Sequence, residues 1–335
     1  MNSEEYKYIE HEEFVYPKLV CIETYHGCNA RCGFCPVSLW PRQKGPMSDA
    51  IFNTIICQLA DWGPGKLKQV ALMMNGEPLL DKKLEKRLLC CKREKLPNVG
   101  FTTNASLMDS KRALSIINVS PDYVVFSFDS LDKRAYERNR VGLSYDVVLK
   151  NVVGFIRKRN EANSDIRVVL RYVDFKDDRS GFDEYCLWFR QMLKEDLDEV
   201  QYTRMHNAGF RPSIKTELAN GDFGMNPCGS PFNRMIIQSD GQVSLCAHDF
   251  NADYKFGNIM DQHVLEIFNC ERFREVRKTH KAHKRNTLLR CSTCDEPEID
   301  LDGNTFLKYT PSAKLFFNKS KVGFDYDKER KKVAE

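Results

Sequence analysis

The chain alternates short β-type segments with longer helical patterns over its first two-thirds, and this alternation constrains its fold most strongly. Segments rich in Val, Ile, Leu, Phe and Tyr predict strands at 18–24, 69–74, 99–104, 123–129, 166–173 and 199–205. Helices are predicted at 48–62, 82–95, 109–117, 144–161 and 183–195. Strand–helix units in series predict an α/β fold, a parallel sheet curled into a partial (β/α)6 TIM-like barrel. The active site is then expected on the loops at the carboxyl ends of the strands.

The pattern changes after residue 210. Two short apolar segments flank Ser239-Asp240-Gly241, which predicts a hairpin, and a single helix is predicted over 261–280. We therefore expect four parts in the 335 residues: an N-terminal extension, the barrel, a small auxiliary domain of hairpin plus helix, and a C-terminal appendage. Their expected bounds are 1–16, 17–210, 211–300 and 301–335.

Composition narrows the classes of function. The net charge of +4 is spread along the chain, so no nucleic-acid partner is expected. No apolar run is long enough for a membrane span, and the acidic start at Met1–Glu5 does not resemble a signal peptide. A cytoplasmic location is expected, and there the 13 cysteines point to metal binding or catalysis rather than to disulfides.

Three cysteines directly follow the first predicted strand, in Cys28-Asn-Ala-Arg-Cys32-Gly-Phe-Cys35. This spacing can wrap three corners of a four-iron cluster and leave one iron without a protein ligand. An open position is what a cofactor that binds the metal requires. A structural zinc site, with His26 as a fourth ligand, is the alternative reading of the same motif.

With this motif at the end of its first strand, the chain resembles the radical S-adenosylmethionine (SAM) superfamily over residues 17–210. The resemblance implies that Cys28, Cys32 and Cys35 hold a [4Fe-4S] cluster and that SAM chelates its fourth iron. Reductive cleavage of SAM would give a 5′-deoxyadenosyl radical that abstracts a hydrogen from a small-molecule substrate. A reducing flavodoxin or ferredoxin would supply the electron.

The resemblance also implies contacts to SAM from residues at the predicted strand ends. Glu77, in Asn75-Gly76-Glu77-Pro78, would receive the SAM amino group, because a carboxylate suits an ammonium. Arg140 would pair with the SAM carboxylate, with Arg171 as the alternative. The remaining candidates are Phe34 beside the adenine, Gly76 in the Glu77 segment, Asn104 at the ribose, and Ser127. His206, after the sixth strand, is a candidate catalytic base or substrate contact.

A second cysteine set lies in the expected auxiliary domain: Cys228, Cys246, Cys291 and Cys294. Four thiolates can close a complete iron–sulfur cluster or a zinc site, and spacing alone does not separate the two metals. The arrangement resembles the twitch or SPASM-type extensions of radical SAM enzymes, and its spacing is similar to that of an aminocyclitol dehydrogenase of the family. This resemblance implies one auxiliary [4Fe-4S] cluster.

The favoured function is oxidation of a carbinol in a sugar- or cyclitol-like molecule, with the auxiliary cluster accepting the second electron. An epimerase is an alternative, with a hydrogen donor among the other cysteines: Cys21, Cys57, Cys90, Cys91, Cys186 and Cys270. A peptide-modifying radical SAM enzyme is another. A non-enzymatic electron-transfer or zinc-binding protein would not account for the SAM-type residues at the strand ends.

Overall fold

The computed structural model describes residues 14–38, 42, 44–175, 180–205 and 227–294, which fall into two compact units. Among these residues, the first unit contains those up to Asn29, those of Phe34–Thr102 and those after 226. The second contains Ala30–Gly33 and the described part of Thr103–Met205.

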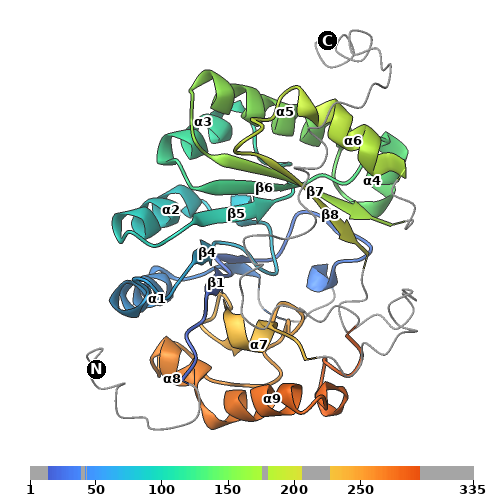
Figure 1. Ribbon diagram of the computed structural model, residues 1–335. Helices are drawn as coiled ribbons and strands as arrows, with labels where there is room; N and C mark the ends of the chain where they lie inside the picture. Colours follow the sequence, from blue (N-terminus) through green and yellow to red (C-terminus); the bar gives the residue numbers. More distant parts are fainter. Residues whose placement is uncertain (1–13, 39–41, 43, 176–179, 206–226, 295–335) are drawn as a thin grey trace. The chain divides into compact units, whose positions relative to one another are not determined.

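Five strands of the main sheet lie in the first unit, in the order β10-β9-β1-β4-β5. Figure 1 labels β1, β4 and β5 of this set. Strands β1 (Leu19–Ile22), β4 (Gln69–Ala71) and β5 (Val99–Thr103) run parallel, as the sequence predicts. Strand β9 (Arg234–Ile237) pairs in parallel with the other side of β1, and β10 (Val243–Ser244) returns antiparallel to β9. The predicted hairpin therefore extends the sheet that begins with β1.

The helices of the first unit follow the expected amphipathic pattern. Helix α1 (Asp49–Trp62) begins at Ser48, whose side chain accepts a hydrogen bond from the Ile51 N–H. Helix α2 is Leu84–Arg93, and α7 (Ser230–Asn233) immediately precedes β9. The short elements are β2 (Tyr25–His26), β3 (Gly45–Pro46) and the 3-10 helices η2 (Pro36–Ser38), η3 (Pro78–Leu80) and η6 (Arg285–Thr287).

The helix expected over 261–280 is divided in two. Helix α8 (Val264–Phe268) ends at Asn269, and α9 (Glu271–Lys281) starts directly after Cys270. The Asn269 amide accepts from the Val15 N–H and donates to the carbonyls of Val15 and Leu265. An asparagine that bonds backbone groups in this way competes with the helix for them, and the single-helix prediction was wrong for this reason.

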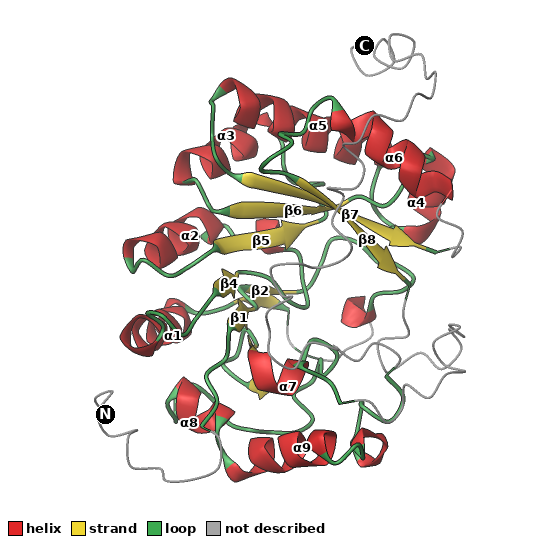
Figure 2. Cartoon of the chain, in the orientation of Figure 1, coloured by secondary structure: helices red, strands yellow, loops and turns green. Residues whose placement is uncertain are grey.

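The second unit contains the parallel strands β6 (Tyr123–Ser127), β7 (Arg167–Asp174) and β8 (Glu199–Arg204). Helices α3 (Ser110–Val119), α5 (Tyr145–Glu161) and α6 (Ser180–Arg190) lie alongside these strands, and the sequence predicted all three (Figure 2). The short α4 (Lys133–Asn139), capped by Asp132, was not predicted. The mixed, mostly parallel arrangement confirms the α/β class.

Candidate active site and auxiliary metal centre

The first cysteine motif follows β1, at the strand end where the sequence placed it, and lies between the two short paired strands β2 and β3. Cys28 and Cys35 are half-buried in the first unit, whereas Cys32 is buried in the second. In the described part of the chain, no three His, Cys, Asp or Glu side chains close around a single metal ion. A four-iron cluster makes a different demand, because each cysteine binds its own iron.

Gly76 is required by the backbone that leads to Cys28. A Cβ atom at this position would lie 2.2 Å from the Tyr25 carbonyl oxygen and 2.7 Å from the Gly27 carbonyl oxygen. The two loops are joined by hydrogen bonds from the Gly27 N–H to the Asn75 carbonyl and from the Glu77 N–H to the Gly27 carbonyl. The predicted SAM segment therefore packs directly on the loop that carries Cys28.

The carboxylate of Glu77 is buried and accepts a hydrogen bond from the Leu79 N–H at 3.0 Å, which caps η3. Its role at the SAM amino group stays a prediction. One carboxylate can serve both roles, because its two oxygens together accept up to about four hydrogen bonds. Phe34 lies in the same unit, seven residues after Gly27.

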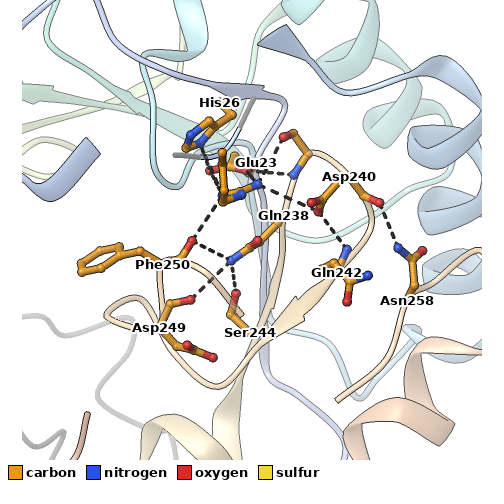
Figure 3. Close-up of polar contacts among 11 residues, drawn as sticks. Glu23, His26, Gln238, Asp240, Gln242, Ser244, Asp249, Phe250 and Asn258 are labelled. Carbon is orange, nitrogen blue, oxygen red and sulfur yellow. Dashed lines mark hydrogen bonds and ion pairs between the residues drawn. The ribbon is translucent and has the colours of Figure 1, made fainter. Parts of the chain in front are cut away.

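A buried polar network joins the end of β1 to the β9–β10 hairpin (Figure 3). Glu23 is fully buried and accepts hydrogen bonds from the Ser239 N–H at 2.8 Å, Arg42 Nη2 at 2.6 Å and His26 Nδ1 at 3.1 Å. Burial alone would raise the pKa of Glu23, but these hydrogen bonds and the charge of Arg42 together hold it below its usual value. Sequence analysis missed Glu23, although a single acid at the end of an apolar strand was the available signal.

The same network continues into the loop after β10. Arg42 also donates to the Phe250 carbonyl, and the Gln238 amide donates to Ser244 Oγ and to the carbonyls of Asp249 and Phe250. Since this loop carries Cys246, the network connects the strand before Cys28 with the segment that holds an auxiliary cysteine.

In the second unit, Arg140 forms a bidentate ion pair with Asp129, and both side chains are buried. Burial alone would lower the pKa of Arg140, but the carboxylate of Asp129 has the larger combined effect and holds this pKa above its usual value. The Cys32 thiol also acts on the pKa of Arg140, so these two predicted site residues lie close together. The pairing of Arg140 with a SAM carboxylate stays a prediction.

The other predicted cofactor contacts of the second unit lie at or near strand ends. The Asn104 side chain, just after β5, accepts hydrogen bonds from Ser106 N–H and Oγ and forms a local turn. Ser127 ends β6 and is half-buried, and Arg171 on β7 donates to Gln201 Oε1 at 3.3 Å. His206 lies outside the described residues.

The four auxiliary cysteines are brought together in the first unit. Burial raises the pKa of Cys246, and the thiols of Cys291, Cys294 and Cys228 raise it further. Burial likewise raises the pKa of Cys291 to about 12, with Cys228 and Cys294 adding to it. Four thiolates that interact in this way repel one another unless positively charged metal ions lie among them. The donor set therefore fits an iron–sulfur cluster.

The six remaining cysteines have different surroundings. Cys21, Cys91 and Cys186 are buried, Cys90 and Cys270 are half-buried, and Cys57 is exposed. No geometry singles out one of them as a hydrogen donor.

Comparison with known families agrees with both cysteine sets. Residues 22–178 match the radical SAM superfamily, and residues 228–295 match SPASM, an iron–sulfur cluster-binding domain. The chain is therefore a radical SAM enzyme with a SPASM-type domain. Such an enzyme uses a [4Fe-4S] cluster with SAM, and its SPASM domain implies auxiliary iron–sulfur clusters, as the sequence predicted.

A relative from Niallia circulans, the SAM-dependent 2-deoxy-scyllo-inosamine dehydrogenase, is 24% identical over 286 residues, covering 85% of this chain and 95% of the relative. The structure is also similar to BtrN in complex with AdoMet and 2-DOIA, with a TM-score of 0.58, 20% identity, and coverage of 86% of this chain and 96% of BtrN. SuiB of Streptococcus suis bound to its precursor peptide SuiA has a TM-score of 0.65 at 16% identity, with coverage of 84% and 70%.

The likeness to solved structures concerns the fold and confirms the predicted barrel-type α/β class. Among the described helices, none combines the length and the apolar character needed to cross a membrane.

Proposed function

We propose that this enzyme oxidises a carbinol of a sugar- or cyclitol-like small molecule to a carbonyl. The observation that carries the proposal is the set of four mutually interacting auxiliary thiols, Cys228, Cys246, Cys291 and Cys294. Oxidising a carbinol removes two electrons, and a hydrogen atom taken from carbon accounts for one of them. Similarity to an aminocyclitol dehydrogenase over 85% of the chain supports the substrate class.

Seven cysteines are assigned to two clusters. Cys28, Cys32 and Cys35 hold the first cluster, and the four auxiliary cysteines hold the second. When bound, SAM with its cluster supplies a 5′-deoxyadenosyl radical, and the auxiliary cluster supplies a one-electron acceptor.

The protein's own groups bind and orient. Glu77 holds the SAM amino group through a charge-assisted hydrogen bond, while Arg140, Asn104, Ser127 and Phe34 complete the cofactor site. His206 is proposed to accept the hydroxyl proton of the substrate, so that hydrogen atom, proton and second electron are all accounted for.

The test uses anaerobically reconstituted protein, dithionite as reductant, SAM and a panel of aminocyclitols. A dehydrogenase gives a product lighter by two hydrogens together with 5′-deoxyadenosine. An epimerase gives a product of unchanged mass in H2O, and in D2O its product gains deuterium from the solvent. The double variant Cys291→Ala/Cys294→Ala should keep SAM cleavage and lose product. Product formation at the wild-type rate by the folded double variant would refute the electron-acceptor role.

A further inference from the structure

Two buried basic side chains lie against the auxiliary cysteines, and sequence analysis singled out neither. His280, near the end of α9, is fully buried, and Arg285, the first residue of η6, is 1% exposed. Burying polar groups in this way is costly unless they bond specific partners. The partners of both side chains are segments that carry the proposed cluster ligands.

His280 joins two of these segments, and its contacts determine which ring nitrogen carries the proton. Nδ1 lies 3.0 Å from the Cys228 backbone nitrogen, and a backbone N–H can only donate, so Nδ1 accepts. The proton of the neutral ring is then on Nε2, which lies 3.6 Å from Cys291 Sγ. His280 therefore accepts from one cysteine's backbone and donates to another cysteine's sulfur.

Arg285 holds the last pair of cysteines through their backbone. Nη1 donates to the Cys291 carbonyl at 2.9 Å and to the Cys294 carbonyl at 3.1 Å, and Nη2 donates to the Cys294 carbonyl at 3.2 Å. A guanidinium keeps its positive charge at all relevant pH values. Its hydrogen bonds to both carbonyls hold this positive charge beside the backbone of Cys291 and Cys294.

A backbone group adds to the same pattern. The His248 N–H points to Cys246 Sγ at 3.4 Å. Two ligand sulfurs thus accept N–H hydrogen bonds, and a fixed positive charge is bonded to the backbone of two ligand residues. Each contact favours greater negative charge at the site.

We propose that His280 and Arg285 are positioning residues that raise the reduction potential of the auxiliary cluster. This inference rests on the proposed function, in which that cluster accepts an electron. Reduction adds one negative charge to the cluster, and hydrogen bonds to its sulfurs together with a nearby cation stabilise the reduced form more than the oxidised form. The site is thereby suited to take an electron from a substrate radical.

The test isolates the auxiliary cluster in the full-length Cys28→Ala/Cys32→Ala/Cys35→Ala background and measures its midpoint potential by redox titration with electron paramagnetic resonance. Arg285→Gln should disfavour reduction about tenfold, which is about 59 mV for a one-electron couple. Arg285→Lys, which keeps the positive charge, should have a midpoint potential close to that of the background protein. Arg274→Gln, on the exposed face of α9, is the matched control and should leave it unchanged.

His280→Phe provides a second and independent variant, because it removes the N–H donor while filling the same space. It should shift the potential in the same direction. If Arg285→Gln and His280→Phe both hold four irons at the background potential, the tuning role is overturned and the proposed function stands. If both lose their iron, the residues are purely structural and the inference is again overturned. A background protein without iron would refute the auxiliary cluster and the proposed function together.

Discussion

Replacing Glu23 with glutamine tests the network that joins β1 to the β9–β10 hairpin. The carboxylate accepts four hydrogen bonds: His26 Nδ1 at 3.1 Å, Ser239 N at 2.8 Å, and Arg42 Nη2 at 2.6 Å and Nη1 at 3.2 Å. Glutamine keeps one acceptor oxygen, but its amide presents N–H donors to other donors. It also leaves the charge of Arg42, only 12% exposed, without its carboxylate.

Breaking a buried ion pair on one side costs about 3–5 kcal/mol, and the residual exposure of Arg42 places this pair at the lower end, about 3 kcal/mol. The entropy of unfolding is about 2.1 cal/mol/K per residue, or about 0.7 kcal/mol/K for 335 residues, so Glu23→Gln should lower Tm by about 4 °C. Thermal unfolding followed by circular dichroism under anaerobic conditions measures this change. Glu275→Gln, on the exposed face of α9, is the control and should change Tm little.

The stability that Glu23 contributes to the folded chain decreases at acidic pH. Because the pKa of Glu23 is lower in the folded chain than in the unfolded chain, its stabilisation is present above the unfolded value of about 4.3 and is lost as the pH falls through the folded value. The stability gap between wild type and Glu23→Gln should therefore narrow below about pH 4.

A double variant tests whether the ion pair is responsible. Glu23→Gln/Arg42→Met leaves no unpaired charge, so it should lose less stability than the sum of the two single variants. Additive losses, or a Glu23→Gln protein with wild-type Tm, would refute the reasoning.

Three further outcomes are expected. Reconstituted wild-type protein should bind about eight irons and the Cys28→Ala/Cys32→Ala/Cys35→Ala variant about four, by iron assay; zinc in place of iron would contradict both assignments. Gly76→Ala should lower stability by about 1–3 kcal/mol or more, because the added methyl group would meet fixed backbone atoms. Gly154→Ala is the control, since its methyl group has open space in α5, and it should not lower stability. Equal Tm values for the two variants would show that the loop at Gly76 moves to accept the methyl group. Glu77→Gln keeps an acceptor for η3 but loses the charge, so SAM binding measured by calorimetry should weaken by about 1.5–3 kcal/mol; unchanged affinity would remove Glu77 from the SAM site.

Periodicity in the sequence was sufficient to predict the main strands and helices. Helix α1, for example, has a capping serine and a repeating apolar face, and both signals lie within one short segment. The division between α8 and α9 depends instead on Asn269 meeting Val15, which is 254 residues away in sequence. No local pattern contains that contact, so the single helix was predicted in error.

The candidate site shows the same limit. The cysteines could be found because ligand spacing is a property of the sequence itself. Glu23, His280 and Arg285 could not be assigned roles, because each acts through partners brought near by folding. A lone buried acid or base has no spacing signature until its partners are known.

The arrangement of the first unit gives a physical reason why two distant cysteine segments can work in one enzyme. Strand β1 leads to Cys28 and strand β10 leads to Cys246, and β9 lies between β1 and β10 in the same sheet. Glu23 bonds the turn of this hairpin through Ser239, and Arg42 bonds both Glu23 and the Phe250 carbonyl in the loop beyond Cys246. A change in the hairpin is therefore transmitted to the strand before Cys28 through short, buried contacts. Substitutions at Glu23 should for this reason affect iron retention at Cys28 and at Cys246 together, whereas substitutions at Arg285 should affect the auxiliary site alone.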